Sequence, residues 1–447
     1  MDKKDLLKRF EEDQIENLWV VYHDYNGRAC AKTVPTPKFE SVLEQGIVFA
    51  RANLNFAVND HISADGIYQA ETGDFLAVPD PASYRKLGYL NNTAMVFSYM
   101  MTEEYNPFDG CPRRALTNMI KQYAEQDIKI TTAFEAEFSL FNKVGKGEYA
   151  PTNHDGMFTV TGLNRYAGMM HEIVSTLEGM GIRVEQLGKE YGPSQYEYTV
   201  RYETPMQSVD DYLAGKEVVR AVAQKHGVIA SFMPKPYENI PGNGLHIHIA
   251  LWDHRTEENI MAGGSLAKPL SETGNYFVGG LLSHAAGLSG AGSPTVNSYK
   301  RLLPGSWAPA HVVWGVGNRG ALVRIPDVNM RCRAEYRAGD NTCNPYIYLC
   351  VLLAAGLDGI DRQLDPGQPF NDVDVGQFTE ADMLQHGVDY LPRTLPKALD
   401  ALEKDPVLMR ALGPVIGQEF LKVKRLELES YNPHVHPWER EMYLEIT

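Results

Sequence analysis

The sequence lacks the features that mark membrane proteins, secreted disulfide scaffolds and zinc-knuckle proteins. It has no run of about 18 apolar residues, the length that a membrane-spanning helix requires. Its five cysteines are odd in number and show no CxxC spacing, so they indicate neither a disulfide framework nor a zinc knuckle. The opening MDKKDLLKRF is followed by acidic residues instead of the apolar core of a signal peptide. We therefore expect a cytoplasmic protein that contacts no membrane and keeps its cysteines reduced and mostly buried.

Positive charge is also scarce in this chain. Lys and Arg total 42 against 57 Asp and Glu, which gives a net charge of −15. Such a charge repels a phosphate backbone, so we expect no nucleic-acid partner. Hydrophobic residues make up 44% and charged residues 22%, a balance typical of a folded protein. A length of 447 residues predicts two or more domains.

The character of the chain changes near residue 106. Before it, residues 18–34 indicate two short strands around Asn26-Gly27, which is a hairpin signal. After it, the segment NPFDGCP at 106–112 precedes an amphipathic helix that begins at Arg113. Further helices are predicted over residues 166–179 and 209–226. We predict an N-terminal domain over residues 1–105 and a larger domain over residues 106–447.

Four short segments place acidic, imidazole or guanidinium groups on one face of a predicted strand. Residues two apart share a face, because side chains alternate along a strand. The polar faces hold Glu135 and Glu137 in residues 131–140, Glu197 in 195–202, His246 and His248 in 245–251, and Arg333, Glu335 and Arg337 in 333–337. The opposite face of the second segment is apolar and consists of Tyr196, Tyr198, Val200 and Tyr202.

These polar faces have two explanations. For any single strand, the solvated face of a half-exposed sheet is the simpler one. A solvated face would carry Lys, Thr and mixed charges, whereas these carry Glu, His and Arg with little Lys. If the four strands belong to one sheet, five carboxylates, including that of Glu190, would lie close together. They could not all stay ionised there without positively charged partners. Carboxylates with imidazole and no thiolate favour Mg²⁺ or Mn²⁺, so the pattern predicts a divalent-metal site.

Arginine is concentrated in one stretch of this otherwise acidic chain. The stretch contains Arg301, Arg319, Arg324, Arg331, Arg333 and Arg337. Guanidinium groups bind carboxylates and phosphates through paired hydrogen bonds, although any single one could instead pair with a surface acid. Arginines beside divalent metals suit phosphoryl transfer, because both neutralise charge on the transferring group. ATP is therefore the expected co-substrate.

The two common glycine-rich phosphate-binding motifs do not provide a nucleotide-binding loop in this chain. Residues 315–320, GVGNRG, match GxGxxG after a strand-like segment at 311–314. The residues that follow, ALVRIP at 321–326, predict a strand and not the helix whose N-terminus would bind a pyrophosphate. No GxxxxGK[ST] occurs either. We therefore expect phosphates to be held by metals and side chains.

Several longer segments match one enzyme family. They are FEAEF at 134–138, FMPKP at 232–236, NGLHIH at 243–248, NSYKRL at 297–302, NR at 318–319, RIP at 324–326 and NPY at 344–346. On these segments the chain resembles the bacterial dodecameric type of glutamine synthetase over nearly its whole length. The resemblance implies an α+β fold, in which a small β-grasp-like domain precedes a catalytic domain with an antiparallel half-barrel sheet flanked by helices. Members phosphorylate the γ-carboxylate of glutamate with ATP, and an amine then displaces phosphate to give an amide.

The same resemblance assigns roles to individual residues. It implies two or more divalent ions per site, held by Glu137, Glu190 and Glu197 on the glutamate side and by Glu135, His246 and Glu335 on the nucleotide side. Around glutamate it implies Arg301 on the α-carboxylate, Gly242 beside the substrate and Arg337 at the γ-carboxyl. Arg319 and Arg324 are implied to stabilise the transferring phosphate. The residues implied for the nucleotide are His248, Arg324, Arg333, Glu185 and Tyr202.

Departures from the family pattern concern the amine. In ammonium-using members, a loop after the NSYKR segment carries Glu two residues after Pro-Gly, whereas here Pro304-Gly305 is followed by Ser306 and Trp307. Ala50 stands where the family has an Asp of the ammonium pocket. Two lost carboxylates weaken binding of a bare cation, while Trp307 offers an apolar wall or π face to an alkylated amine. The alternative is that Trp307 only packs in a loop that still admits ammonia.

The sequence thus predicts an ATP-dependent ligase that joins glutamate to a small primary amine, such as methylamine, ethanolamine, another alkylamine or a polyamine. Ordinary glutamine synthesis with ammonia is the alternative. A catalytically silent regulatory homologue is disfavoured, because the metal-ligand positions and core arginines are all present. Pro241 stands where the family has Asn, while Arg301 favours an α-carboxylate substrate. The resemblance implies a homo-dodecamer of two hexameric rings, and the short segment around Tyr390 implies no adenylylation control.

Overall fold

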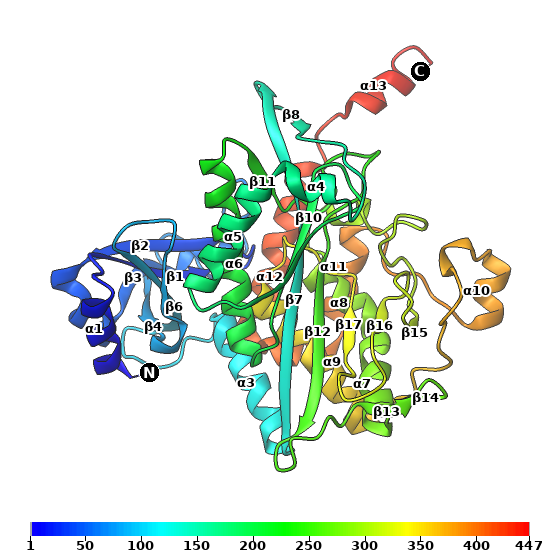
Figure 1. Cartoon of the computed structure of the whole chain (residues 1–447), viewed down its shortest axis with the longest axis horizontal. Coiled ribbons are helices and arrows are strands. Elements are labelled where there is room, and N and C mark those ends of the chain that lie inside the picture. The colour runs from blue at the N-terminus through cyan, green and yellow to red at the C-terminus, as the bar shows by residue number, and fades with distance from the viewer. Residues whose placement is uncertain (1, 447) are drawn as a thin grey trace.

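The computed structural model describes residues 2–446 and has an α+β architecture built around two sheets. In Figure 1 the N-terminal sheet lies to one side of a larger sheet, whose long strands β7 and β12 run through the middle of the molecule. Helices surround the larger sheet. The predicted α+β fold is confirmed, whereas the division at residues 105/106 stays a prediction. Among residues 2–446, no helix is long and apolar enough to cross a membrane.

The N-terminal sheet has six strands in the order β2-β1-β6-β4-β3, with β5 paired to β6. The strands are β1 (Asn17–His23), β2 (Ala29–Pro35), β3 (Ile47–Ala50), β4 (Asp74–Pro79), β5 (Arg85–Lys86) and β6 (Thr93–Met101), and the flanking helices are α1 (Lys3–Glu12) and α2 (Phe39–Gln45). The expected hairpin joins β1 and β2, with His23 opposite Ala29. Gly27 closes its turn with a φ of 73°, a left-handed conformation that glycine adopts without strain. Three short 3₁₀-helices complete this part: η1 (Thr36–Lys38), η2 (Arg51–Asn55) and η3 (Pro81–Ser83).

The larger sheet has nine strands in the order β15-β16-β17-β12-β7-β10-β9, with β8 and β11 also paired to β7. Its strands are β7 (Ile128–Gly145), β8 (Glu148–Pro151), β9 (Val184–Lys189), β10 (Gln195–Val200), β11 (Ile229–Ser231), β12 (Leu245–Asp253), β15 (Trp314–Val316), β16 (Val323–Ile325) and β17 (Ala334–Tyr336). All pairs are antiparallel except β15 with β16. A separate hairpin consists of β13 (Ala262–Ser265) and β14 (Lys268–Leu270).

The four predicted polar strands are consecutive neighbours in this sheet, in the order β17-β12-β7-β10. Their registers place the polar residues directly opposite one another. The opposed pairs are Glu137 with Glu197, Glu135 with His246, and Glu335 with His248. Directly opposed residues on adjacent strands share one face, so the alternation read from each segment becomes one continuous polar surface.

The other face of the sheet is covered by helices. In the helical layer are α3 (Pro112–Glu125), α4 (Val160–Arg165), α5 (Ala167–Gly179), α6 (Pro205–Lys225), α7 (Glu272–Ser283), α8 (Ala285–Gly292) and α9 (Pro345–Arg362). The ring of Phe134 on β7 stacks on Tyr212 of α6 at 5.0 Å between centroids. The helices predicted at 113, 166–179 and 209–226 are confirmed, and α6 begins earlier because Pro205 occupies its first turn.

The C-terminal quarter is mostly helical. It consists of α10 (Glu380–His386), α11 (Leu395–Lys404), α12 (Pro406–Tyr431) and α13 (Pro437–Tyr443), and the remaining 3₁₀-helices are η4 (Ser298–Lys300) and η5 (Val375–Gln377). In Figure 1 α13 projects away from the body of the molecule. Four of the five cysteines are buried, which agrees with the expectation from the sequence.

One side-chain placement in the sequence analysis is wrong. Tyr202 was expected on the apolar face with Tyr196 and Tyr198, which are buried. The register between this segment and β7 shifts by one residue after Thr199. Thr199 lies opposite Glu135, but Glu203, four residues later, lies opposite Thr132, which is only three residues away from Glu135. One extra residue reverses the faces of everything beyond it. Tyr202 therefore lies on the polar side, next to His248.

Candidate active site

One cavity on the polar face of the large sheet gathers most of the predicted site residues. Those that line it are Glu135, Glu137, Glu190, Glu197, Gly242, His246, Arg301, Trp307, Arg319 and Arg337. Lining residues that were not predicted from the sequence include Met157, Tyr191, Gln195 and Ala308. The remaining predicted residues lie around the cavity but do not line it: Glu185, Tyr202, His248, Arg324, Arg333 and Glu335. The sheet registers explain why residues so far apart in sequence meet here.

The carboxylates at one end of the cavity repel one another. Glu137 accepts hydrogen bonds from the Gly244 amide at 2.6 Å and from Gln195 at 3.2 Å. Burial and then the charge of Glu137 raise the pKa of Glu190 to about 7. Burial raises the pKa of Glu197 well above its ordinary value, and the neighbouring carboxylates raise it further. These acids therefore lack the positive charge that would keep them all ionised.

Glu135 lies between the two histidines of β12. Its Oε1 is 2.7 Å from Nδ1 of His246, and its Oε2 is 3.4 Å from Nε2 of His248. Burial opposes ionisation of Glu135, but the hydrogen bonds to both imidazoles outweigh it and hold its pKa well below the ordinary value. The two imidazoles are themselves buried. Glu135 thus connects the carboxylate end of the cavity to the strand that carries His248.

Two groups of side chains here could hold metal ions. In each, the ligand atoms lie within 4.8 Å of one another, and the groups are Glu135 with His248 and Glu335, and Glu135 with Glu197 and His246. The donor set fits hard divalent cations, because it offers carboxylate oxygens and imidazoles without thiolates. The mutual repulsion of the buried acids fits them as well. These groupings differ from the two sets implied by the resemblance, since Glu135 belongs to both and His248 enters one.

Glu335 is completely buried between two arginines. Its Oε2 accepts a hydrogen bond from Arg324 at 2.8 Å, and its Oε1 pairs with Arg337. Burial opposes ionisation of Glu335, but Arg337 and then the two histidines of β12 outweigh it and lower its pKa to about 2. Arg337 also donates from Nε to the carbonyl of Arg319 at 3.0 Å. Glu335 therefore positions the side chains of Arg324 and Arg337.

Arg301 is buried beside Gly242. Its Nη2 donates to the carbonyls of Ala338 and Gly339 at 2.5 and 2.7 Å, which fixes the guanidinium. Its Nε is buried and has no hydrogen-bond partner in the described chain. A Cβ on Gly242 would lie 2.3 Å from the Pro234 carbonyl and 2.7 Å from Cγ of Arg301, so only glycine fits there. Arg301 is thus a fixed cation at the wall of the cavity, which suits an anionic ligand.

Arg333, Tyr202 and His248 form a second cluster beside the cavity. Nε of Arg333 donates to Nδ1 of His248 at 3.2 Å, and its guanidinium lies 5.6 Å from the centroid of the Tyr202 ring. Burial raises the pKa of Tyr202 to about 12, although Arg333 opposes the shift. Glu185 is exposed on β9. An aromatic ring with an arginine and an imidazole can hold a flat, phosphorylated ligand.

Trp307 lies in a loop at the mouth of the cavity. Its ring stacks on Tyr191, with 5.7 Å between centroids and 21° between planes. Trp307 has a φ of 62°, which is rare for a bulky residue and is found mostly where surrounding structure enforces it. The sequence did not lead us to predict Tyr191 as a site residue. Its position directly after the predicted metal ligand Glu190 could have indicated it. The stack forms an aromatic wall on one side of the cavity.

The GxGxxG match is not a nucleotide-binding loop. Gly315 lies on β15, and the chain continues into β16, which runs parallel to β15. A strand therefore follows the motif, as predicted, and no helix N-terminus faces a ligand. Asn318 holds the connecting loop, because its Oδ1 accepts from the Gly320 amide at 2.9 Å and its Nδ2 donates to the Phe370 carbonyl at 2.7 Å.

Sequence comparisons connect the chain to one group of enzymes. A family model described as glutamine synthetase, catalytic domain, matches residues 109–443. A relative from Halobacterium salinarum, named glutamine synthetase, is 35% identical and covers 99% of this chain and 97% of its own length. A relative from Pyrococcus abyssi with the same name is 37% identical and covers 92% of this chain and 90% of its own length.

Structural comparisons give the same answer over the whole chain. A GmaS/ADP complex superposes with a TM-score of 0.87 at 32% identity, covering 98% of this chain and 99% of that one. Ligand-free GmaS gives a TM-score of 0.85 at 32% identity, with 99% and 100% covered. GmaS is a gamma-glutamylmethylamide synthetase, a glutamine synthetase-like enzyme. A structure described as a novel glutamine synthase homolog gives 0.83 at 27% identity, with 94% and 96% covered.

Proposed function

The chain belongs to the glutamine synthetase family, and on that premise we propose that it is an ATP-dependent ligase that joins glutamate to a primary amine larger than ammonia. The reaction has two steps. A γ-carboxylate oxygen of glutamate takes the terminal phosphoryl group of ATP and ADP leaves; the amine nitrogen then bonds to the acyl carbon and phosphate leaves. The product is a γ-glutamyl amide. The convergence of the predicted metal, arginine and nucleotide residues around one cavity supports catalysis over a silent regulatory role.

The observation that carries the choice of amine is the aromatic wall. Trp307 stands where ammonium-using members have a glutamate, and its ring stacks on Tyr191 beside the cavity. A neutral wall does not balance the charge of ammonium, whereas it excludes water from the carbon atoms of an alkylamine. The likeness to GmaS at 32% identity over nearly the whole chain supports an organic amine as acceptor.

On the glutamate side, Arg301 binds the α-carboxylate of the substrate. Its Nη2 is held by two backbone carbonyls, which fixes the guanidinium at the wall of the cavity, where a carboxylate would pair with it. Gly242 lets the side chain of Arg301 pack directly against the backbone at the wall of the cavity, because any side chain there would meet Arg301.

The phosphoryl group is stabilised by arginines around the cavity. Arg319 and Arg337 line it, and Arg324 is held beside it by Glu335. Guanidinium groups neutralise charge on the transferring group and the leaving phosphate. The nucleotide occupies the cluster of Tyr202, Arg333 and His248, with the adenine ring near Tyr202 and the phosphates near Arg333 and His248. Glu185 on β9 completes the proposed nucleotide side.

The carboxylates and histidines hold two or more divalent cations, Mg²⁺ or Mn²⁺. The residues that would hold them are Glu135, Glu137, Glu190, Glu197, His246 and Glu335, with His248 close enough to take part. Bound there, such ions supply charge neutralisation for the phosphates and for the γ-carboxylate. Glu137 and Glu197 occupy directly opposite positions on β7 and β10, so the sheet itself sets the spacing of these ligands.

Glutamine synthesis from ammonia is the second candidate. It is favoured by the names of the curated relatives, which are glutamine synthetases at 35–37% identity. The two candidates share the metal ions, ATP and glutamate, and they differ only at the amine. Only a comparison of ammonia with organic amines as substrates can therefore distinguish the two candidate functions.

We also propose a cytoplasmic homo-dodecamer of two hexameric rings. Ala50, the residue that replaces an acid of the ammonium pocket, lies at the end of β3 in the N-terminal sheet and does not line the cavity of its own chain. In the proposed ring, the N-terminal sheet of one subunit would bring Ala50 to the cavity of its neighbour. Sedimentation of the purified protein tests this assembly, and a stable monomer would contradict it.

The deciding experiment measures phosphate release from ATP with glutamate and Mg²⁺ across a panel of amines. The panel contains ammonia, methylamine, ethanolamine, butylamine and putrescine. We expect kcat/KM for at least one organic amine to exceed that for ammonia about tenfold or more. If ammonia gave the highest kcat/KM and the organic amines gave none, the chain would be an ordinary glutamine synthetase. If no amine released phosphate, the silent-homologue hypothesis would be correct.

A further inference from the structure

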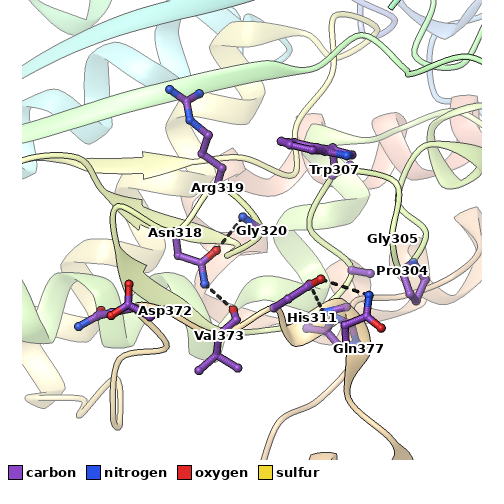
Figure 2. Close-up of a pocket in the computed structure, with 15 residues that line it drawn as sticks. Pro304, Gly305, Trp307, His311, Asn318, Arg319, Gly320, Asp372, Val373 and Gln377 are labelled. Atoms are coloured by element: carbon purple, nitrogen blue, oxygen red, sulfur yellow. Dashed lines mark hydrogen bonds between the residues drawn. The ribbon is translucent and has the colours of Figure 1, made fainter. Parts of the chain in front are cut away.

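A second cavity lies beside the first, on the other side of Trp307. Its volume is about 510 Å³, and it shares Trp307, Ala308 and Arg319 with the candidate active site. Figure 2 shows Trp307 and Arg319 at one side of this cavity and Asp372, Val373 and Gln377 at the other. A ligand that extends past Trp307 would therefore pass from one cavity into the other. We call it the side cavity.

The far wall of the side cavity is acidic. Asp372 and Asp374 line it and are exposed, and no ion pair among the described residues 2–446 involves either of them. Asp374 accepts hydrogen bonds from the Gly376 amide at 3.0 Å and from Gln377 at 3.3 Å, which holds its carboxylate in place. Arg319 is the one cation that lines the described cavity, and Figure 2 shows its side chain extending away from Asp372.

His311 supplies an independent sign of an absent ligand. It lines the side cavity and is only 3% exposed, yet its imidazole makes no hydrogen bond in the described part of the chain. One face of the ring packs on Tyr390 at 4.8 Å between centroids. Burial and then Arg393 lower the pKa of His311, so the ring is neutral and one nitrogen offers a lone pair. Since no protein group in the described chain hydrogen-bonds to this imidazole, it can accept a hydrogen bond from a ligand in the side cavity.

We propose that the side cavity binds the distal ammonium group of a diamine or polyamine acceptor, with Asp372 and Asp374 as its counter-ions and His311 as a hydrogen-bond acceptor. This inference rests on the proposed function and specifies its amine. The proximal amine reaches the first cavity, and the alkyl chain crosses the aromatic face of Trp307. A protonated amine beside two carboxylates and an indole is favoured by charge and by cation–π attraction.

Only the proximal nitrogen reacts. It forms a bond to the γ-carbonyl carbon of γ-glutamyl phosphate, the carbon–oxygen bond to phosphate breaks, and phosphate leaves with that electron pair. The nitrogen releases its proton to water. The distal nitrogen stays protonated throughout, so the product is a glutamyl amide that keeps one positive charge. An uncharged alkyl tail would leave the two carboxylates without a partner, and an anionic tail would be repelled.

The test compares putrescine with butylamine, which has the same carbon chain without the second amine. We expect kcat/KM for putrescine to exceed that for butylamine about tenfold or more. The double variant Asp372→Asn/Asp374→Asn should lower the ratio of the two values about tenfold, because asparagine keeps the turn at Gly376 but carries no charge. The single variant His311→Phe should lower the same ratio, while keeping the ring that packs on Tyr390.

Asp365→Asn is the matched control. Asp365 accepts from the Gly367 amide at 2.9 Å in the same kind of turn as Asp374, but it lies outside the side cavity. Its substitution should leave the putrescine to butylamine ratio unchanged. Equal values for putrescine and butylamine in the native enzyme, or a ratio that the double variant does not lower, would overturn the inference. Because butylamine and methylamine would still react in that case, the proposed function would stand; use of ammonia alone would overturn both.

Discussion

The indole of Trp307 stacks on the phenol ring of Tyr191 with 5.7 Å between ring centroids and 21° between ring planes. Tyr191 lies in the turn between β9 and β10, directly after Glu190, and Trp307 lies in the loop after η4. Both rings line the candidate active site and remain more than half exposed, at 57% and 67%. This contact joins a proposed metal ligand, Glu190, to the loop that we propose faces the amine, and it makes substrate choice the most informative property to measure.

Replacing Trp307 by glutamate should shift the enzyme toward ammonia. The new carboxylate would stand where ammonium-using members have one, while the apolar wall for a carbon chain would be lost. We expect the ratio of kcat/KM for ammonia to that for methylamine to rise about tenfold or more, which corresponds to about 1.4 kcal/mol. Trp307→Phe keeps an aromatic wall and serves as the control. An unchanged ratio in Trp307→Glu would show that Trp307 does not contact the amine.

Tyr191 should contribute through its ring and not through its hydroxyl. Stacked aromatic pairs add about 0.5–1.5 kcal/mol beyond their buried area. Tyr191→Leu should therefore raise the KM for the preferred organic amine about 2- to 10-fold, because Trp307 would lose its support. Tyr191→Phe keeps the stack and should have the native KM. Equal KM values for the leucine and phenylalanine variants would contradict a role for the stack.

Gly242→Ala should damage glutamate binding while the fold stays intact. The added Cβ would lie 2.3 Å from the Pro234 carbonyl and 2.7 Å from Cγ of Arg301, so the guanidinium must shift. We expect KM for glutamate to rise about tenfold or more, with far-ultraviolet circular dichroism unchanged. Gly188→Ala on β9 is the control, because its Cβ would meet nothing within 4 Å. A native KM for glutamate in Gly242→Ala would exclude Arg301 as the carboxylate-binding residue.

Glu197→Gln should remove the effect of divalent metal on stability. Glu197 lies opposite Glu137 on the neighbouring strand, so metal-free protein carries uncompensated like charges there. Native protein should gain melting temperature when Mg²⁺ or Mn²⁺ replaces a chelator. The variant should show a smaller gain and lose about 100-fold or more of its activity. Glu125→Gln, at the exposed end of α3, is the control. A full metal-dependent gain in Glu197→Gln would exclude it as a ligand.

His284 should make the stability of the fold depend on pH. It is buried, with Nδ1 at 2.6 Å from Asp405 and Nε2 at 3.0 Å from Asp358. Burial opposes its protonation, but the hydrogen bonds to Asp405 and Asp358 outweigh it and raise the pKa of His284. A raised folded pKa contributes stability that is complete below the unfolded value of about 6.5 and is lost as the pH rises through the folded pKa.

The variant His284→Gln tests this contribution. It should be less stable than native protein by about 1–3 kcal/mol at pH 6 and by less at pH 9, as measured by urea unfolding. Burial opposes ionisation of Asp405, but the hydrogen bonds from His284 and from the Leu408 and Val407 amides together outweigh it and lower the pKa of Asp405, so its share is lost only in more acidic solution. His171→Gln on the exposed face of α5 is the control. A difference that does not change between pH 6 and pH 9 would contradict a charged His284.

Periodicity predicted the individual strands of the site correctly. Alternation put Glu135 and Glu137 on one face of β7, and His246 and His248 on one face of β12, and each of these pairs lies on the polar side of the sheet. This succeeded because the side-chain period of a strand is a local property of the backbone. The same rule failed at Tyr202, where the pairing of β10 with β7 slips by one residue. A slip depends on the partner strand and leaves no mark in the local sequence.

Other features needed side chains to meet across the fold. Tyr191 and Trp307 come from segments far apart in sequence, and nothing in either segment shows that their rings stack. Glu335 was expected as a metal ligand, and the structure adds that Arg324 and Arg337 occupy its two oxygens. The side cavity combines residues of three segments, including Asp372 and His311, whose local sequences carry no recognisable motif.

The sequence by itself therefore determined the composition of the site: its carboxylates, imidazoles and arginines, and the strands that carry most of them. These are properties of residue type and local period, which one strand expresses without its neighbours. Only the tertiary structure decided the order β17-β12-β7-β10, the registers that oppose Glu137 to Glu197, and the walls around the amine. Those depend on which strands pair and how loops pack, because long-range contacts arise from the whole chain and not from any segment of it.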